Sequence, residues 1–436
     1  MLARRTLPTI SVSIVCLVAA CRESAGPKQD AGVQAASALA LQAGDSQFAL
    51  VGRQVPINPA VRVVDDSGNT VQGITVMFAV TSGGGTATGT SAVSDSAGIA
   101  TVGSWVLGPD LGTNTMTATI SNSADVSPFV FTAIALCDCW KERAALNQAR
   151  RLAGSAVLNG KLYVLGGLNQ RDNTLPVEEY DPASDTWTVR GTAPAQYKTG
   201  VVALSGELYI VAGDFNSTTT SLQSYDPVTG RWTVHPAPPT PRSQMEAAVV
   251  DGRLYVLGGI DEITGLLPTV EAFDPATETW TTVAPMPRGR RWASVAVVDG
   301  ILYVIGGEAR GGPGTYVSEI VASVIAYDPK TDTWTEKASL PELVSNAAVG
   351  VVSGRIYVAG GTHFEWTGTG PDLYATEIWS SYVYVYDPQM DQWSIQSPMR
   401  TGRYEATAAE LDGVLYVIGG IGTRGAMLGI VEALNP

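Results

Sequence analysis

Six short hydrophobic stretches of nearly the same wording recur along the last two thirds of the chain. Each combines leucine, valine or isoleucine with one tyrosine and ends in glycine, as in L-Y-V-L-G-G. The six copies occupy residues 162–167, 208–213, 254–259, 302–307, 356–361 and 415–420. Successive copies begin 46 to 59 residues apart. Repeats of this length that hold several short strands are typical of the blades of a β-propeller.

Polar residues frame each hydrophobic stretch in a constant order. A turn dipeptide ending in glycine, such as Asn159-Gly160, joins an alanine- and valine-rich strand to the stretch. A later strand ends in an aromatic residue, an aspartate and a proline, followed by a tryptophan, as in residues 180–182 and Trp187. The aspartate and the proline favour a reverse turn into a further strand. Each repeat therefore predicts four antiparallel strands.

The last repeat lacks a fourth strand of its own. The chain ends at residues 434–436, a degenerate copy of the turn, with no tryptophan after it. Trp140 lies 47 residues before Trp187, which is close to the spacing of the later tryptophans. We therefore expect residues 139–143 to pair with residues 430–434. This pairing closes the ring with an N-terminal strand and removes an exposed sheet edge.

These repeats resemble the kelch family of β-propellers, in which paired glycines, a spaced aromatic residue and a later tryptophan mark every blade. The resemblance covers residues 137–436. It implies a six-bladed kelch β-propeller, and it is far less specific for function than for fold.

The first 35 residues predict an export signal followed by a tether. A basic start at Arg4 and Arg5 precedes an apolar run that is too short to span a bilayer, which predicts a signal peptide over residues 1–20. The sequence V-A-A-C, ending at Cys21, resembles the lipobox of bacterial lipoproteins and implies lipidation of Cys21; an ordinary signal peptide with a chance cysteine is the alternative. Arg22 then favours the outer membrane or the cell surface, facing outward or toward the periplasm. Residues 21–35 are small and polar and predict a flexible tether.

Residues 36–136 alternate β-forming residues with turn clusters. About seven short strands over roughly 100 residues predict a β-sandwich. The order resembles the bacterial Ig-like domains of invasin- and intimin-type adhesins, in which such a domain is a stiff spacer or is itself adhesive. The whole chain is thus expected to be all-β, with an Ig-like sandwich followed by the propeller.

The net charge of the chain limits the classes of molecule that it is expected to bind. The formal net charge is −14, and losing Arg4 and Arg5 with the signal makes it more negative, so a nucleic-acid partner is excluded. After the signal and Cys21, the remaining cysteines are Cys137 and Cys139, for which a mutual disulfide, free thiols and metal binding stay open. Nothing in the pattern sets an oligomeric state.

Four repeats carry an arginine nine residues before the turn dipeptide. These arginines are Arg150, Arg242, Arg290 and Arg403. In kelch domains, arginines at this place often point to the mouth of the central channel and grip acidic groups, which makes them candidate ligand-binding residues. The alternative is that they cap strands or pair with carboxylates of neighbouring blades. Glu246 and Glu405 lie on the same strand openings.

The most irregular loops follow the glycines of the fourth and fifth repeats, over residues 308–319 and 362–379. The second is rich in aromatic residues, which dominate contact energy in binding sites. Phe364, Trp366 and Tyr374 are the candidate ligand-binding residues there, and packing against their own blade is the alternative. Trp379 is expected to belong to the core.

The sequence gives less support to an enzymatic function than to a binding function. Galactose oxidase, a copper-dependent kelch propeller, uses two histidines and two tyrosines, whereas this chain has only His235 and His363. We expect no metal, no other cofactor and no catalytic residues. The prediction is a membrane-anchored adhesion or recognition protein whose propeller binds a protein or a carbohydrate. A sugar-directed kelch enzyme, such as a sialic-acid mutarotase, is the alternative.

Overall fold

The computed structural model describes residues 35–121, 125–169, 175–193, 200–213, 220–261, 263–310, 318–367 and 374–436. The signal peptide, Cys21 and all of the tether except Ala35 lie outside these residues. The chain divides into two compact units, Met1–Ala135 and Leu136–Pro436. Within the described residues, no helix has the length and apolar character needed to cross a membrane.

The N-terminal unit is built of antiparallel sheets. One sheet joins β1 (Ala38–Ala43), β3 (Ala60–Val64) and β7 (Ile99–Thr101). A second joins, in spatial order, β2 (Gln47–Leu50), β10 (Phe129–Leu136), β9 (Gly112–Ile120), β4 (Thr75–Ser82) and β6 (Ser91–Val93). A short pair joins β5 (Thr86–Thr88) and β8 (Ser104–Val106). These ten described strands exceed the seven expected, because four of them are three-residue segments beside turns.

One hydrophobic core holds the sheets of this unit together. It combines Val61 and Val63 of β3 with Phe78 of β4 and Phe131 of β10. Buried and more exposed residues alternate along β9, as the two-residue period of a strand requires when one face is covered. Trp105 is completely buried in this core.

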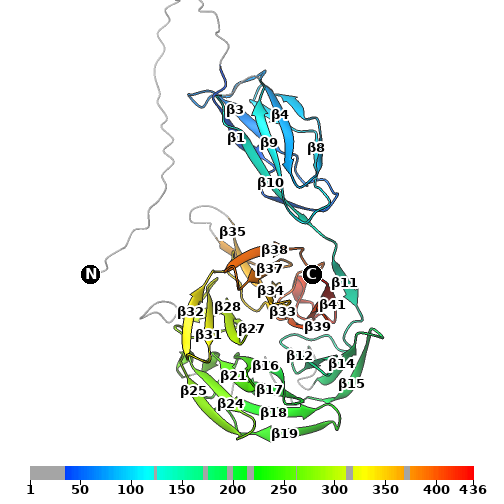
Figure 1. Ribbon diagram of the computed structural model, residues 1–436, viewed down its shortest axis with the longest axis vertical. Helices are drawn as coiled ribbons and strands as arrows, with labels where there is room; N and C mark the ends of the chain where they lie inside the picture. Colours follow the sequence, from blue (N-terminus) through cyan, green and yellow to red (C-terminus); the bar gives the residue numbers. More distant parts are fainter. Residues whose placement is uncertain are drawn as a thin grey trace, which may run out of the picture. The chain divides into compact units, whose positions relative to one another are not determined.

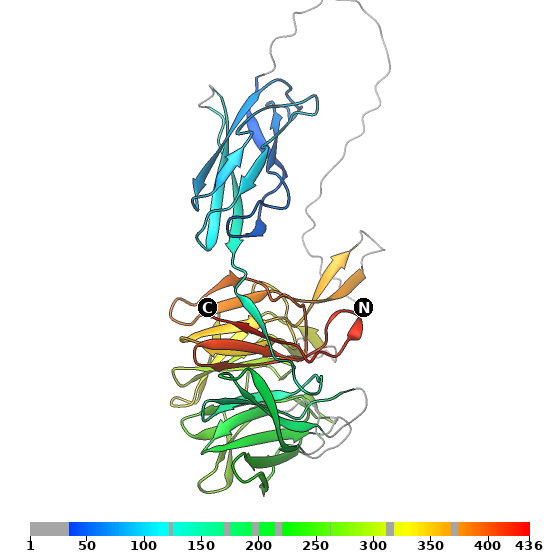
Figure 2. The ribbon, with the colours of Figure 1, turned by 90° about the vertical axis from the view of Figure 1, so that its right-hand side faces the viewer.

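The C-terminal unit contains, in its described part, six four-stranded antiparallel sheets arranged around a centre (Figures 1 and 2). The innermost strands, which number sheets 1 to 6, are β12 (Gly154–Leu158), β16 (Gly200–Leu204), β20 (Glu246–Val250), β27 (Ser294–Val298), β33 (Ala348–Val352) and β39 (Thr407–Leu411). The second strands are β13 (Lys161–Leu165), β17 (Glu207–Gly213), β21 (Arg253–Leu257), β28 (Ile301–Ile305), β34 (Arg355–Ala359) and β40 (Val414–Ile418). The third strands are β14 (Pro176–Asp181), β18 (Thr220–Asp226), β24 (Val270–Asp274), β31 (Val324–Asp328), β37 (Val383–Asp387) and β41 (Val431–Leu434). The outermost strands are β15 (Thr186–Thr192), β19 (Arg231–His235), β25 (Thr279–Val283), β32 (Thr333–Lys337), β38 (Gln392–Gln396) and β11 (Trp140–Arg143).

Sheet 6 joins the two ends of the unit. Its order is β11-β41-β40-β39, and Trp140 lies opposite Leu434 while Arg143 lies opposite Val431. The register confirms the strand pairing that the tryptophan spacing predicts. The innermost strands also contact one another in a closed cycle, with β12 touching both β16 and β39.

The repeated tryptophans fasten each sheet to the preceding one. Trp187 packs on Tyr180 at 5.0 Å between ring centroids, and its indole N–H donates to the carbonyl of Ala144 at 2.8 Å. The amide of Ala144 in turn donates to Asp185, which also accepts the hydroxyl of Tyr180. The same arrangement recurs around Ala284 and Ala338. Each such alanine is thus held at both its amide and its carbonyl.

The paired glycines are required by close backbone approach. Gly258 has a φ of +60°, and a Cβ there would lie 2.4 Å from the carbonyl oxygen of Arg290 in the next sheet. Gly259 donates its amide to that same oxygen at 2.7 Å. A side chain at Gly258 would therefore push adjacent sheets apart.

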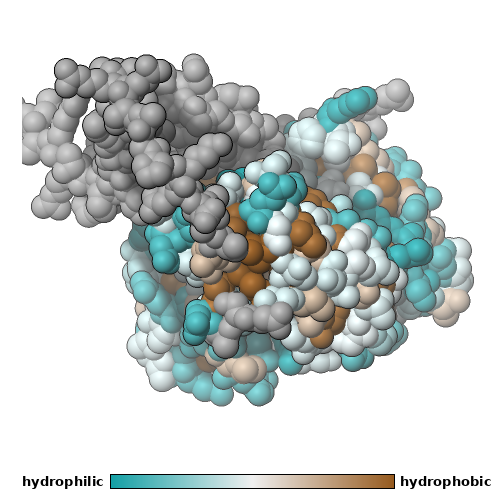
Figure 3. Space-filling view, turned by 90° about the horizontal axis from the view of Figure 1, so that it is seen from above, coloured by the Kyte–Doolittle hydropathy of each residue, from teal (hydrophilic) through white to brown (hydrophobic). Residues whose placement is uncertain are grey.

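Hydrophobic residues also reach the surface singly, which is normal for folded proteins. On the face viewed in Figure 3, brown patches are interspersed with teal and white ones. Exposed apolar side chains include Leu41, Ile57, Val93 and Leu111 in the N-terminal unit, and Val228 and Ile263 in the C-terminal unit.

Candidate functional site

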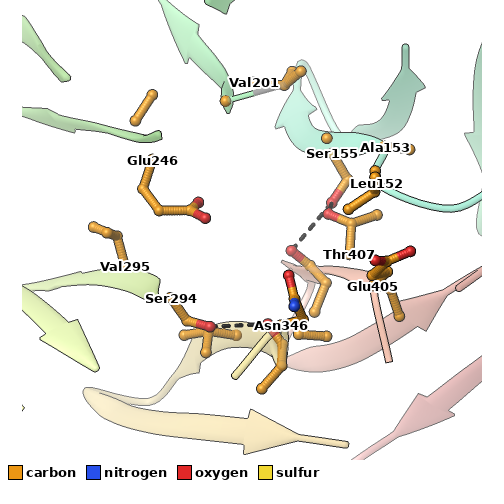
Figure 4. A pocket seen from close by; sticks show the side chains of 18 of the residues that line it. Leu152, Ala153, Ser155, Val201, Glu246, Ser294, Val295, Asn346, Glu405 and Thr407 are labelled. Carbon is orange, nitrogen blue, oxygen red and sulfur yellow. Dashed lines mark hydrogen bonds between the residues drawn. The ribbon is translucent and has the colours of Figure 1, made fainter. Parts of the chain in front are cut away.

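A cavity of about 150 Å³ opens where the innermost strands of the C-terminal unit begin. Alanines and glycines form much of its lining, and the polar part comes from Ser155, Glu246, Ser294, Asn346, Glu405 and Thr407. Figure 4 shows the carboxylate of Glu246 pointing toward the middle of the cavity. We call this region the channel mouth. A second cavity of about 320 Å³ continues among the alanines and valines of the same strands.

A ring of left-handed backbone surrounds the channel mouth. Its described members lie seven residues before the turn dipeptide and have φ between 52° and 56°; they are Leu152, Gln244, Trp292, Asn346 and Glu405. The amide of Asn346 donates to the carbonyl of Trp292, that of Glu405 to Asn346, and that of Leu152 to Glu405. These bonds join sheets 4, 5, 6 and 1. They offset the cost of left-handed backbone in residues other than glycine, which is about 1–2 kcal/mol each.

Charged side chains at the mouth are paired. Arg151 Nη1 lies 3.0 Å from Glu405 Oε2, which links sheets 1 and 6. Arg291 Nη2 lies 2.8 Å from Glu308 Oε2, and the Arg291 guanidinium lies 4.0 Å from the centre of the Trp292 ring. The mouth therefore presents paired charge and aromatic surface.

Two buried polar atoms at the mouth have no protein partner. They are Nε of Arg151 and Oδ1 of Asn346. Such atoms normally bind water or a ligand, because leaving them unsatisfied costs about 1–3 kcal/mol each. Among the described residues, these two atoms add one unpaired donor and one unpaired acceptor to the polar groups of the lining.

The four candidate arginines do not face the channel mouth. Their side chains are buried, with between 0 and 4% of the residue exposed. Arg242 donates from Nη1 to the carbonyls of Gly258 and Thr269, and its Nη2 lies 2.7 Å from Glu271 Oε2. Arg150 pairs in the same way with Glu178, and Arg403 with Glu432. Arg150, Arg242 and Arg403 do not meet the expectation of ligand contact at the mouth, because their donors are turned into their own repeats.

The carboxylate partners differ from those considered from the sequence. Glu178, Glu271 and Glu432 belong to the same sheet as their arginine rather than to a neighbouring one. The sequence held a signal for this arrangement: in these three repeats, each of which also has the arginine, a glutamate stands two residues before the first position of the third-strand motif (Tyr180, Phe273 and Leu434). Burial lowers the pKa of Arg150, Arg242 and Arg403, and the paired glutamate opposes that shift.

The candidate aromatic residues lie on a hairpin of sheet 5. Phe364 and Trp366 belong to β35 (Thr362–Thr367), and Tyr374 begins β36 (Tyr374–Trp379). Their side chains lie outside the described residues, so their role remains a prediction. Trp379 is half-buried and its ring is parallel to that of Tyr404, with centroids 6.3 Å apart. A second irregular hairpin, β29 (Glu308–Arg310) and β30 (Ser318–Ile320), follows the glycines of sheet 4.

The remaining candidate groups lie away from the mouth. The structure joins Cys137 and Cys139 by a disulfide, which was one of the alternatives left open. His235 lies on the outer strand β19, where its ring contacts Ser224 at 2.8 Å and Glu278 at 3.1 Å. The described residues contain no group of three His, Cys, Asp or Glu side chains placed to hold a metal.

Comparisons with known proteins agree with this fold. Residues 153–361 match the KLHDC2/KLHL20/DRC7 Kelch-repeats domain, and residues 344–400 match the Kelch motif. The structure titled "Structure of YjhT" aligns with a TM-score of 0.55 at 18% identity, covering 66% of this chain and 95% of that one. The C-terminal unit therefore carries kelch repeats and has a kelch β-propeller fold.

Several curated proteins share these repeats. Kelch-like protein terF of Aspergillus terreus is 30% identical over 239 residues, which cover 51% of this chain and 52% of that protein. Kelch-like protein 35 of Mus musculus is 39% identical over 99 residues, covering 23% of this chain and 15% of that protein. Kelch repeat and BTB domain-containing protein 12 of Homo sapiens is 33% identical over 126 residues, 27% of this chain and 19% of that protein. The chain thus spans about half or less of the length of these relatives.

Proposed function

We propose that this chain is an exported, membrane-anchored binding protein. In this proposal a lipid at Cys21 holds it at the outer membrane or cell surface, the Ig-like region 36–136 is a spacer, and a six-bladed kelch propeller over residues 137–436 recognises a protein or a glycan. The kelch repeats support a binding role, and the sequence V-A-A-C supports the anchor.

The observation that carries the proposal is the aromatic surface beside the channel mouth. Trp292 is one of the left-handed residues around the mouth, and the guanidinium of Arg291 lies over its side chain. Tyr404 directly precedes another of them, Glu405, and its side chain lies beside that of Trp379. All four side chains are partly exposed. Tryptophan, tyrosine and arginine contribute most of the binding energy in typical interfaces. The backbone of Trp292 is bonded to Asn346 of the next sheet and that of Tyr404 to Ile421, which fixes the positions of these two residues before a ligand arrives.

The size of the cavity favours binding on this face over enclosure of a small substrate. Small-molecule pockets usually measure about 300–1,000 Å³. The polar cavity at the mouth measures about 150 Å³, and the second cavity of about 320 Å³ in the same strands is lined mainly by alanines and valines, which offer few polar contacts to a sugar. A sugar-directed enzyme is the second candidate, because Glu246 and Glu405 place carboxylates at the mouth. Such an enzyme would have to bind an acidic sugar without the four buried arginines.

A binding experiment tests the proposal. The mature chain, made with Cys21→Ser for solubility, is applied to a glycan array and to a panel of purified extracellular proteins. The double variant Trp292→Ala/Tyr404→Ala should lose about 1–3 kcal/mol of affinity for whatever ligand binds, that is, roughly 5- to 150-fold. The matched control Val228→Ala changes an exposed residue in the turn between β18 and β19 and should bind normally.

Two results would contradict the proposal. One is equal weakening by the Val228 control, which would place the ligand elsewhere. The other is catalysis: if the wild-type chain accelerates interconversion of the anomers of a free sugar and Glu246→Gln abolishes this, the second candidate is correct.

A further inference from the structure

Sheet 4 contains a buried arginine that lacks the carboxylate found in sheets 1, 3 and 6. Arg290 occupies the same place as Arg242, and 4% of it is exposed. Its Nη1 donates to the carbonyls of Gly306 at 3.1 Å and Ser323 at 2.9 Å, as that of Arg242 does to Gly258 and Thr269. Half of the guanidinium is therefore bound as in the other sheets.

The other half of the guanidinium is bound differently. Glu271, which lies opposite Val256, is replaced in sheet 4 by Ile325, which lies opposite Val304. Nη2 of Arg290 donates to Oγ of Ser323 at 2.8 Å, and Nε has no partner among the described residues. In Arg242, by contrast, Nε donates to the carbonyl of Thr240 at 3.1 Å.

This replacement leaves positive charge without compensation. The hydroxyl of Ser323 carries no charge, and buried charges are normally paired because their desolvation is costly. Burial and the nearby Arg288 lower the pKa of Arg290 to about 10, so the guanidinium stays protonated at neutral pH. Among the described residues, the site thus has a buried cation with no carboxylate beside Nη2, and an N–H donor at Nε that in sheets 1, 3 and 6 bonds a backbone carbonyl.

We propose that a small monovalent anion, such as formate, chloride or bromide, binds beside Arg290 and takes the place of the missing carboxylate. It accepts hydrogen bonds from Nε and from the second hydrogen of Nη2. Because only 4% of Arg290 is exposed, a side chain of another protein cannot reach this position, so the proposed occupant is a small free ion. In this proposal the anion neutralises Arg290 in sheet 4, as a glutamate neutralises the buried arginine in sheets 1, 3 and 6.

Thermal unfolding of the mature chain in sodium formate tests this proposal, with sodium gluconate holding the ionic strength constant. The wild-type Tm should rise saturably by about 2–4 °C, because formate binds the folded state. Arg290→Met should abolish this rise. Ile325→Glu should supply the carboxylate, raise Tm in the absence of formate and remove the response, whereas the matched control Ile325→Leu should keep it.

Crystals soaked in sodium bromide give a direct readout. An anomalous peak within hydrogen-bond distance of Arg290 Nε is expected in the wild type and not in Ile325→Glu. The proposal is overturned if the wild type shows no saturable response to formate, if Arg290→Met responds as the wild type does, or if bromide is absent beside Arg290. Should Ile325→Glu fail to fold, the comparison of the wild type with Arg290→Met still decides.

Discussion

Replacing Trp140 by alanine should destabilise the C-terminal unit by about 3–5 kcal/mol, the usual cost of deleting a large buried side chain. Trp140 is 1% exposed and packs with Leu415 and Leu434 in the core of sheet 6. Its indole N–H also donates to the carbonyl of Ser397 at 2.8 Å. Losing that donor leaves the carbonyl without this partner, which places the expected loss in the upper part of the range.

Urea unfolding of the mature chain measures this change in the free energy of unfolding, and calorimetry separates the transitions of the two units. Trp280→Ala is the matched control, because Trp280 makes the same bond to the carbonyl of Pro236 at 2.8 Å but is only half-buried. It should cost less than the change at Trp140. A loss below about 1 kcal/mol for Trp140→Ala would show that sheet 6 does not depend on β11 and would refute the account of closure.

Four further predictions concern the buried Arg242–Glu271 pair, the closing strand β11, the lipid anchor at Cys21 and the aspartates that bond to the preceding sheet. Glu271→Ala should cost about 3–5 kcal/mol because it leaves Arg242 buried and unpaired, whereas Arg242→Met/Glu271→Leu should lie near the wild type in urea unfolding; equal losses in both would contradict the pairing. A fragment of residues 146–436 lacks β11 and should aggregate in size-exclusion chromatography through the exposed edge of β41, unlike a fragment of residues 136–436. Cys21→Ser should move the protein from the membrane to the soluble fraction; full retention in the membrane would rule out the lipid anchor. Hydrogen bonds lower the folded-state pKa of Asp185, Asp332 and Asp391 below the ordinary value of 3.8, so their contribution to stability is complete above about pH 4 and is lost as the pH falls through the lowered values. The triple Asp→Asn variant should therefore lose less stability than the wild type between pH 4 and pH 2.

The strand order of the propeller could be predicted because each strand of a repeat begins or ends at a characteristic sequence motif. The turn dipeptides, the glycine pair and the tryptophan recur in one order, so a missing mark is informative. Trp140 could be assigned to sheet 6, about 290 residues from its partner strand, because the last repeat has no tryptophan of its own. The aspartate that precedes the proline of each turn was also visible. Asp185, Asp332 and Asp391, which bond to the preceding sheet, were not, because their partners are spatial neighbours that no local pattern reveals.

The role of the arginines could not be read from their position alone. An arginine at the opening of an inner strand can reach the channel mouth or turn back into its sheet, and the residue type is the same in both cases. The glutamate on the third strand decides between them, since it supplies a buried partner. Comparing the two positions across repeats would have favoured the inward arrangement in sheets 1, 3 and 6.

The left-handed ring had no sequence signal. Its members are leucine, glutamine, tryptophan, asparagine and glutamate, and only asparagine commonly adopts positive φ. The conformation is imposed by hydrogen bonds between adjacent sheets, which exist only once the ring is assembled. Apart from Glu246 and Glu405, which lie on the strand openings that the sequence singled out, the side chains around the channel mouth were therefore the part of the candidate site that sequence reasoning missed.

Closure by β11 also determines how mechanical tension enters the propeller. The segment directly before β11 is bound to sheet 5 through Ser397, which accepts the amide of Cys137, and β11 itself is bound to the last strand of the chain. Any pull applied to the chain before residue 137 acts first on these contacts and on the four residue pairs of β11 and β41. The strand that completes the ring is thus also its attachment point, and under load the propeller would open where its two ends meet.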